Sequence, residues 1–278
     1  MKTNVRGQFD LSGRIAVVTG GAGLLGGQHA EAIAEFGGIP ALLDLNVSVA
    51  QDKAKGITSE YSTPCLALQC DVTKKTDLEQ ARERLLHEFG HIDILINNAA
   101  LDPKVTADMD SPSFNRLESM SVSRWDQEMA VGLTGAFLCA QVFGTDMARR
   151  RSGTIINISS DLGIIAPDQR LYRKPDVPED EQPVKPVTYS VIKHGLIGLT
   201  KYLSTYWAGR GVRVNALCPS GIQVNQPDEF VARLSSMIPL GRMAKPDEYK
   251  AAIVFLASDA SSFMTGATLV LDGGRSVW

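Results

Sequence analysis

The chain has 278 residues, of which 44% are hydrophobic, and a formal net charge of −3. No block of like charge is present, which argues against nucleic-acid binding, because that affinity rests on neutralising phosphates. The four cysteines and four histidines fall in no metal-binding spacing, so we predict buried thiols, a reducing compartment and no metal site. The polar start and the lack of an apolar run long enough to span a bilayer favour a cytoplasmic protein with no membrane partner.

Short apolar runs alternate along the chain with longer amphipathic segments. The runs predict strands at residues 14–19, 39–43, 65–69, 94–97, 154–158, 213–217 and 268–271. The amphipathic segments predict helices at residues 23–36, 76–89, 125–150, 187–208 and 247–257. Most of the strands are continuously apolar, as is typical of strands buried on both faces of a parallel sheet. The alternation predicts an α/β fold: a doubly wound, parallel, seven-stranded sheet with helices on both faces (a Rossmann fold), in a single domain over residues 1–278.

One region breaks this rhythm. Residues 167–186 contain five prolines among many charges, so they can form neither a regular helix nor a central strand. We interpret residues 163–187, approximately, as a loop inserted after the fifth strand, lying over the carboxyl end of the sheet where ligands bind in such folds.

A glycine-rich turn directly follows the first strand. Gly20, Gly23 and Gly26 let the backbone approach a pyrophosphate, and the helix that follows offers it free N–H groups. Asp44 ends the second strand, where an acid can hydrogen-bond the adenosine ribose; the alternative is a helix-capping role. No Arg or Lys lies between Thr19 and Gly27 or directly follows Asp44, so the sequence favours NAD over NADP.

Tyr189 and Lys193 are four positions apart, on one face of a predicted helix. A free phenol has a pKa near ~10, and a neighbouring ammonium lowers it, which would make Tyr189 a usable acid and base. Ser160, at the end of the fifth strand, would donate a hydrogen bond to the substrate oxygen, although Ser159 could take that role. Tyr-x-x-x-Lys is common by chance, so these residues could also be ordinary helix and strand-end residues.

Taken in order, the motifs resemble the short-chain dehydrogenase/reductase family, in its short single-domain branch. The resemblance covers nearly the whole chain through residues 19–26, 71–72, 97–100, 157–160, 189–193, 215–219 and 271–274. It implies an NAD-dependent oxidoreductase that transfers a hydride between the cofactor and a secondary alcohol or ketone, with Ser160, Tyr189 and Lys193 as catalytic residues. The implied cofactor-binding residues are Gly20, Gly23, Leu24, Leu25, Gly26, Asp44, Asp71, Val72, Asn98, Ala99, Ala100, Tyr189, Lys193, Pro219, Gly221 and Ile222. A homotetramer, or a homodimer, is implied as well.

The sequence departs from that branch at four places. Leu24 stands where the branch has Gly, which gives the spacing of the family's longer branch. Gly132 stands where the family has a catalytic Asn. Ser220 interrupts the usual Pro-Gly pair, and 29 positions separate Ser160 from Tyr189, about twice the usual spacing.

The substrate is less constrained. Arg170 and Arg173 in the insert could bind a substrate phosphate or carboxylate together with Ser160 and Tyr189, although a solvated loop is an equal alternative. A second polar stretch, residues 101–123, would flank the same cleft. We expect a small-molecule substrate, a sugar, polyol or sugar acid. The alternatives are an NAD-retaining sugar-nucleotide epimerase or dehydratase, and a non-catalytic NAD-binding protein.

Overall fold

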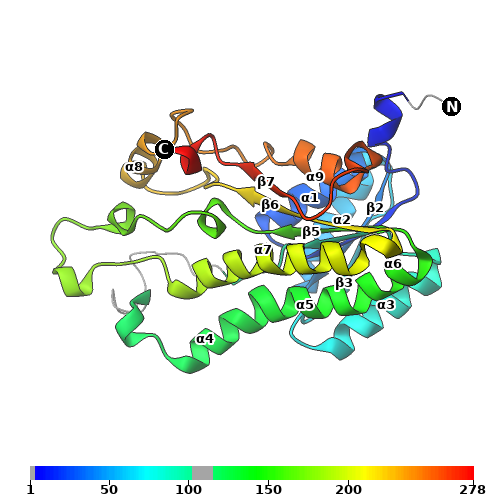
Figure 1. Ribbon diagram of the computed structural model, residues 1–278, viewed down its shortest axis with the longest axis horizontal. Helices are drawn as coiled ribbons and strands as arrows, with labels where there is room; N and C mark the ends of the chain where they lie inside the picture. Colours follow the sequence, from blue (N-terminus) through cyan, green and yellow to red (C-terminus); the bar gives the residue numbers. More distant parts are fainter. Residues whose placement is uncertain (1–3, 102–114) are drawn as a thin grey trace.

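A computed structural model describes residues 4–101 and 115–278. Its centre is one seven-stranded sheet in the order β3-β2-β1-β4-β5-β6-β7 (Figure 1), and every neighbouring pair runs parallel. The strands are β1 (Ile15–Thr19), β2 (Ile39–Asp44), β3 (Leu66–Gln69), β4 (Ile94–Asn97), β5 (Gly153–Ile158), β6 (Val212–Pro219) and β7 (Thr268–Leu271). The sequence-based prediction of a parallel seven-stranded sheet is confirmed, with strand ends shifted by at most two residues.

Helices cover both faces of the sheet (Figure 1). The described helices are α1 (Leu24–Glu35), α2 (Val47–Tyr61), α3 (Lys75–Phe89), α4 (Val122–Met129), α5 (Gly135–Cys139), α6 (Thr145–Arg150), α7 (Val187–Trp207), α8 (Asp228–Ser236) and α9 (Lys250–Ala257). Apolar side chains of α1, α2 and α9 share one buried cluster, whereas those of α3, α5, α6 and α7 share the other. The sheet is therefore the middle layer of three.

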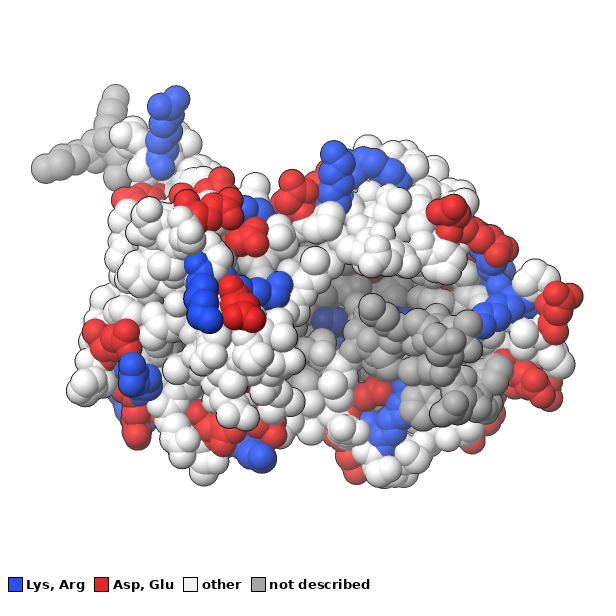
Figure 2. Space-filling view, turned by 180° about the vertical axis from the view of Figure 1, so that it is seen from behind, with Lys and Arg blue, Asp and Glu red and all other residues white. Residues whose placement is uncertain are grey.

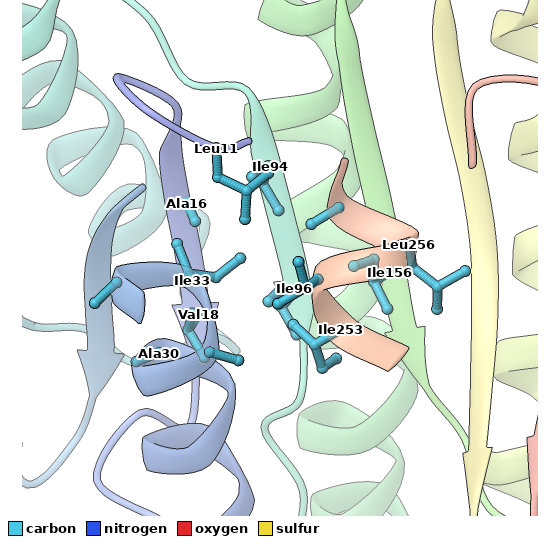
Figure 3. Packing of buried hydrophobic residues seen from close by; sticks show 14 of the residues in the cluster. Leu11, Ala16, Val18, Ala30, Ile33, Ile94, Ile96, Ile156, Ile253 and Leu256 are labelled. Carbon is cyan, nitrogen blue, oxygen red and sulfur yellow. The ribbon is translucent and has the colours of Figure 1, made fainter. Parts of the chain in front are cut away.

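Alternation along the central strands divides the core between these two faces. Ala16 and Val18 of β1 join the cluster beneath α1 and α9, whereas Val17 between them joins the opposite cluster. Figure 3 shows the first of these clusters, in which Ile33 of α1 and Ile253 of α9 lie against the strands. Because both faces of the sheet are covered, every residue of β1 and β4 is buried, and their only polar residues are Thr19 and Asn97 at the strand ends.

Two helices were absent from the sequence-based prediction, and one begins later than expected. The buried stripe of α2 is only Ala50, Ala54 and Ile57, too weakly apolar to mark a helix, although the Asn46 side chain caps its start by accepting from Val49 N at 3.3 Å. The nine-residue helix α8 was also missed, and α9 begins at Lys250 rather than at residue 247.

The helical run Val122–Arg150 corrects one expectation. It consists of α4, α5 and α6 joined by two π-helical turns, and by length and composition it could cross a membrane. The expectation that no apolar run reaches that length is therefore wrong. Half of its most apolar window is buried inside the protein, where Phe143 and Met147 contact the sheet, as in a core helix.

The proline-rich insert is built as an ordered loop with two short turns, η7 (Gln169–Tyr172) and η8 (Glu179–Glu181). The buried Gln182 amide donates to Lys174 O and Val177 O, which closes the loop on itself. Leu171 packs in a small apolar cluster with residues of α8 and the segment after it. In Figure 1 the insert, α8 and the C-terminal segment lie together at one end of the molecule. The insert follows the end of β5 in the chain, and its role as a substrate loop stays a prediction.

Candidate active site

The turn between β1 and α1 is a tight glycine cradle. Gly20 has a φ of +65°, and a Cβ on Gly26 would lie 2.1 Å from Gly20 O, so neither position accepts a side chain without distortion. Gly23 caps α1 with no side-chain hydrogen bond, so the cap residue itself places no side chain over the helix N-terminus that begins at Leu24 and Leu25. A backbone this close, ending at a helix N-terminus, fits a dinucleotide pyrophosphate.

The end of β2 meets this cradle through Asp44. Its Oδ2 accepts a hydrogen bond from Ala22 N at 2.9 Å, and its Oδ1 accepts one from Asn46 N at 2.9 Å. The carboxylate is thus fixed against the glycine turn, at the place where the sequence predicted an acid for the adenosine ribose. It is not the cap of α2, because the Asn46 side chain takes that role.

The end of β4 is joined to the same turn. Thr19 Oγ1 accepts hydrogen bonds from Asn98 N and Ala99 N, each at 3.0 Å, and the Asn98 side chain donates to Thr19 O at 2.9 Å. Ala100 follows and is exposed. These bonds hold the cofactor-binding residues expected on β1 and β4 side by side.

Asp71 and Val72 follow β3. Hydrogen bonds from the Thr73 side chain and backbone hold the Asp71 carboxylate and lower its pKa below the usual value. Val72 is 7% exposed and packs in the core beside Gly135. Pro219, Gly221 and Ile222 leave the end of β6, where Ile222 bridges to Ala244.

The three predicted catalytic residues converge where β5 meets α7. The buried Lys193 Nζ donates to Ile158 O at 2.8 Å, which ties α7 to the last residue of β5. The same Nζ lies 5.5 Å from the centroid of the Tyr189 ring. Ser159 Oγ donates to Lys193 O at 2.7 Å and so holds β5 to α7, whereas Ser160 Oγ donates to the neighbouring Asp161 carboxylate at 2.8 Å.

Gly132 lies in the π-helical turn between α4 and α5, opposite α7. A Cβ there would lie 2.7 Å from Ile192 Cγ2, so Ile192, directly before Lys193, fills the space that a side chain at position 132 would need. No asparagine side chain can enter this arrangement unless Ile192 moves.

The two arginines proposed to bind substrate are already paired within the insert. The Arg170 guanidinium forms three hydrogen bonds with the Asp168 carboxylate, which raise the pKa of the guanidinium, and Arg173 pairs with Glu179. Both line a pocket of about 440 Å³, whereas neither lines the adjoining pocket of about 370 Å³ that reaches Lys185 and Ser190. Residues 102–114 of the second polar stretch lie outside the described residues.

Two features near the site were missed by sequence reasoning. Lys185, from the end of the insert, places its Nζ 3.8 Å from the centroid of the Tyr189 ring. Asp161, directly after Ser160, is a buried carboxylate paired with Arg275 from the C-terminal segment. A charged residue beside an apolar strand end was the only sequence signal for Asp161.

In the parts of the chain that the structure describes, no group of three or more His, Cys, Asp and Glu residues could hold a metal ion. All four cysteines are free; burial raises the pKa of Cys65 and Cys70 to about 12, which makes thiolate chemistry unfavourable there.

A dinucleotide cradle beside a Ser-Tyr-Lys group defines a nicotinamide-dependent oxidoreductase on a doubly wound sheet. Family models described as short chain dehydrogenase and as Enoyl-(Acyl carrier protein) reductase match residues 14–172 and 181–276. The chain therefore belongs to the short-chain dehydrogenase/reductase family, in its single-domain size class, and is an oxidoreductase acting on alcohol groups.

Several relatives that are similar over nearly their whole length are named for small hydroxylated molecules. D-threitol dehydrogenase of Mycolicibacterium smegmatis is 34% identical, over 97% of this chain and 95% of that protein. NAD-dependent glycerol dehydrogenase of Listeria innocua is 31% identical, over 97% and 96%. A gluconate 5-dehydrogenase from Burkholderia cenocepacia J2315, solved in complex with NADP and tartrate, has a TM-score of 0.83 and 28% identity, covering 98% of each chain.

Proposed function

We propose that this protein oxidises a secondary hydroxyl of a polyol or sugar with NAD, and reduces the corresponding ketone in reverse. The observation that carries the proposal is the tie between Lys193 and Ile158, which brings Tyr189 and Ser160 to one strand end beside the glycine cradle. The bound cofactor supplies hydride transfer. The chain's own residues orient the alcohol and manage its proton.

Tyr189 is the acid and base in this proposal. Two ammonium groups, of Lys193 and Lys185, lie near its ring at 5.5 and 3.8 Å from the centroid. Positive charge at this range stabilises a phenolate relative to a phenol, which favours transfer of the substrate's hydroxyl proton to Tyr189. Ser160 donates to the substrate oxygen and stabilises the charge that develops there.

The preference for NAD is a proposal supported by Asp44. A 2′-phosphate at the ribose would meet this carboxylate, and the residues that follow it, Leu45 and Asn46, carry no cation. Similar proteins include one named NAD-dependent and one bound to NADP, so the choice rests on this chain's own residues.

Charge pairing inside the insert favours a neutral substrate over a sugar acid. Arg170 and Arg173 face Asp168 and Glu179, which leaves their charges balanced within the loop. A substrate carboxylate would have to displace these acids. We therefore rank neutral polyols and sugars first, and sugar acids second.

The direct test is a panel of threitol, glycerol, xylitol, mannitol, sorbitol and gluconate, followed by NADH absorbance with NAD and NADP in parallel. Turnover of a neutral polyol with NAD supports the proposal. Turnover only of gluconate, or only with NADP, contradicts the corresponding half of it.

Two alternative functions can be distinguished from the proposed one by the amount of NAD bound to the purified protein and by turnover on the panel. The Gly20-Gly23-Gly26 spacing is that of the longer branch, which suggests an NAD-retaining epimerase or dehydratase, and Gly132 suggests a non-catalytic NAD-binding protein. An epimerase would be purified with NAD firmly bound and would show no net NADH formation. A non-catalytic protein would bind exchangeable NAD without turnover on any substrate of the panel.

We also propose that the chain acts as a single cytoplasmic domain and assembles as a homotetramer or homodimer. Tyr202 and Tyr206 on α7 support assembly, because they are more than 60% exposed and stack with ring centroids 5.6 Å apart. Aromatic side chains on an exposed helix face are typical of subunit contacts. Sedimentation of the purified protein tests this.

A further inference from the structure

The carboxylate of Asp161 is the centre of a buried hydrogen-bond network beside the catalytic serine. The residue is 2% exposed. Its Oδ1 accepts from Ser160 Oγ and from Leu162 N, both at 2.8 Å. Its Oδ2 accepts from Ser220 Oγ at 2.8 Å and from Arg275 Nη1 at 2.7 Å. This carboxylate thus joins the end of β5, the segment after β6 and the C-terminal segment.

The C-terminal segment is shaped to deliver Arg275 to this place. Gly274 has a φ of +91°, and the Asp272 carboxylate accepts hydrogen bonds from Gly274 N at 2.9 Å and Ser276 N at 2.7 Å. This turn directs Arg275 inward, where it is only 6% exposed. Burying a carboxylate and a guanidinium is costly even when they are paired, so the pair calls for a role beyond holding the fold.

We propose that Asp161 and Arg275 are positioning residues for the Ser160 hydroxyl; the inference rests on the proposed function. The hydroxyl has one proton, and in the free protein its hydrogen bond goes to Asp161 while Leu162 N donates to Ser160 Oγ at 3.2 Å. To stabilise charge on the substrate oxygen, Ser160 must turn and donate to that oxygen instead.

Arg275 lowers the free-energy cost of moving the Ser160 hydrogen bond from Asp161 to the substrate oxygen. When Ser160 turns away, the Asp161 carboxylate keeps its bonds from Leu162 N, Ser220 Oγ and Arg275 Nη1. Without the guanidinium, the carboxylate charge would be shared by fewer donors and would hold the Ser160 proton more tightly. Arg275 therefore acts on the reaction through Asp161 and Ser160, without touching the substrate.

The test is a double-mutant cycle between Arg275→Met and Ser160→Ala, with kcat measured at saturating NAD and polyol. We expect Arg275→Met to lower kcat ~10-fold in the native background and less than ~2-fold in the Ser160→Ala background, because the serine carries the effect. The Kd for NAD should change by less than ~2-fold, since the glycine cradle is untouched. An equal loss of kcat in both backgrounds, or no loss at all, overturns the inference.

Two further variants keep the test readable if Arg275→Met folds poorly. Arg275→Lys retains the charge and should keep most of the wild-type kcat. The double variant Asp161→Asn, Arg275→Met should have a higher kcat than Arg275→Met alone, because an amide competes less strongly than a carboxylate for the serine proton. Failure of both expectations also overturns the inference. All rates are expressed per NAD-binding site, so that unfolded protein is excluded.

Asp93→Asn is the matched control. This carboxylate pairs with Arg150 and accepts from Ile15 N at the opposite, amino end of the strands, so kcat should not change. A wild-type protein that oxidises no alcohol of the panel would refute the proposed function. A wild-type enzyme with an additive cycle would refute only the role of Asp161 and Arg275.

Discussion

At the scale of single residues, the proposed chemistry depends on the charges around the phenol of Tyr189. The Lys193 ammonium donates a hydrogen bond to Ile158 O at the end of β5, and the Lys185 ammonium, from the end of the insert, lies over the Tyr189 ring. An ammonium over an aromatic face is attracted to it, and both ammonium groups favour the ionised phenol. The insert therefore does more than lengthen the spacing between Ser160 and Tyr189, because its last residues contribute a charge to the site.

Replacing Tyr189 with Phe separates catalysis from binding. The change removes the hydroxyl that exchanges the proton and keeps the ring, so we expect kcat to fall by ~10³-fold or more, with the Kd for NAD nearly unchanged. Stopped-flow or steady-state NADH absorbance gives the rate, and NADH fluorescence gives the binding. Retention of more than a tenth of the wild-type kcat would show that another group handles the proton.

Asp44 is the residue that we propose to govern the choice between NAD and NADP. We expect Asp44→Ala to lower kcat/KM for NAD by ~10-fold and to raise it for NADP, because the ribose loses an acceptor while a 2′-phosphate loses a repelling charge. Asp52→Ala is the control: it removes the same charge from an exposed site on α2, where Asp52 pairs with Lys55. If both variants shift the NADP to NAD ratio equally, the effect is one of net charge and not of Asp44.

At the scale of secondary-structure elements, the contact between the 122–150 helix and α7 compensates for a missing side chain. Gly132 lets the two helices approach, and Ile192 packs into the space with Leu196 and Ala136. Because Ile192 precedes Lys193 on α7, this packing also fixes the register of the catalytic helix. The glycine at position 132, in place of the family's asparagine, and the isoleucine at position 192 thus depend on each other, because Ile192 fills the space that a side chain at position 132 would need.

Gly132→Ala should lower the stability of the fold, because position 132 has no room for a side chain. The new Cβ would lie 2.7 Å from Ile192 Cγ2, and overpacking a core costs about 1–3 kcal/mol, against a gain of about 1 kcal/mol in helix propensity. We expect a net loss of stability in urea unfolding, and a smaller effect of the same change in an Ile192→Ala background, where the clashing side chain is absent. The control is Gly198→Ala in α7, where nothing lies within 4 Å of the new Cβ and a gain of about 0.5–1 kcal/mol is expected. Equal effects at both glycines would contradict the argument.

At the scale of the whole molecule, the sequence predicted what short-range patterns encode. The short apolar runs predicted all seven strands, and the glycine turn after the first of them predicted the position of the cradle. The weakly apolar stripe of α2 hid that helix. Asp161 and Arg275 are 114 positions apart and meet only in the folded chain, so no local spacing could reveal their pairing.

The pairing of charged side chains is another property that depends on the folded structure and cannot be read from the sequence. The basic residues of the insert suggested an anion site in the sequence, but folding brings acids of the same loop against them. Figure 2 shows the same intermixing on one face of the molecule, where Lys and Arg lie among Asp and Glu. Local clusters of like charge in a sequence are therefore weak evidence for a binding surface until their partners are known.

His29 couples the stability of the whole fold to pH. It lies on α1 at 1% exposure, and neither ring nitrogen has a hydrogen-bond partner within the described residues. Burial lowers the pKa of His29 to about 3, from an ordinary value of 6.5. Below pH 6.5 the His29 ring binds a proton in the unfolded chain but not in the folded chain. The contribution of His29 to stability is therefore fully present above pH 6.5 and is lost progressively toward pH 3.

The size of this effect is large enough to measure. Each pH unit in that window corresponds to about 1.4 kcal/mol, so lowering the pH from 7 to 5 should cost about 2 kcal/mol through His29 alone. His29→Leu replaces the ring with an apolar side chain that cannot titrate, so urea unfolding of this variant should lose that part of the pH dependence between 7 and 5. Buried carboxylates with lowered pKa values act below this window and leave the comparison intact. The same slope in wild type and variant would mean that His29 takes up its proton in the folded state, and that the ring has a partner or a water path not evident from its burial.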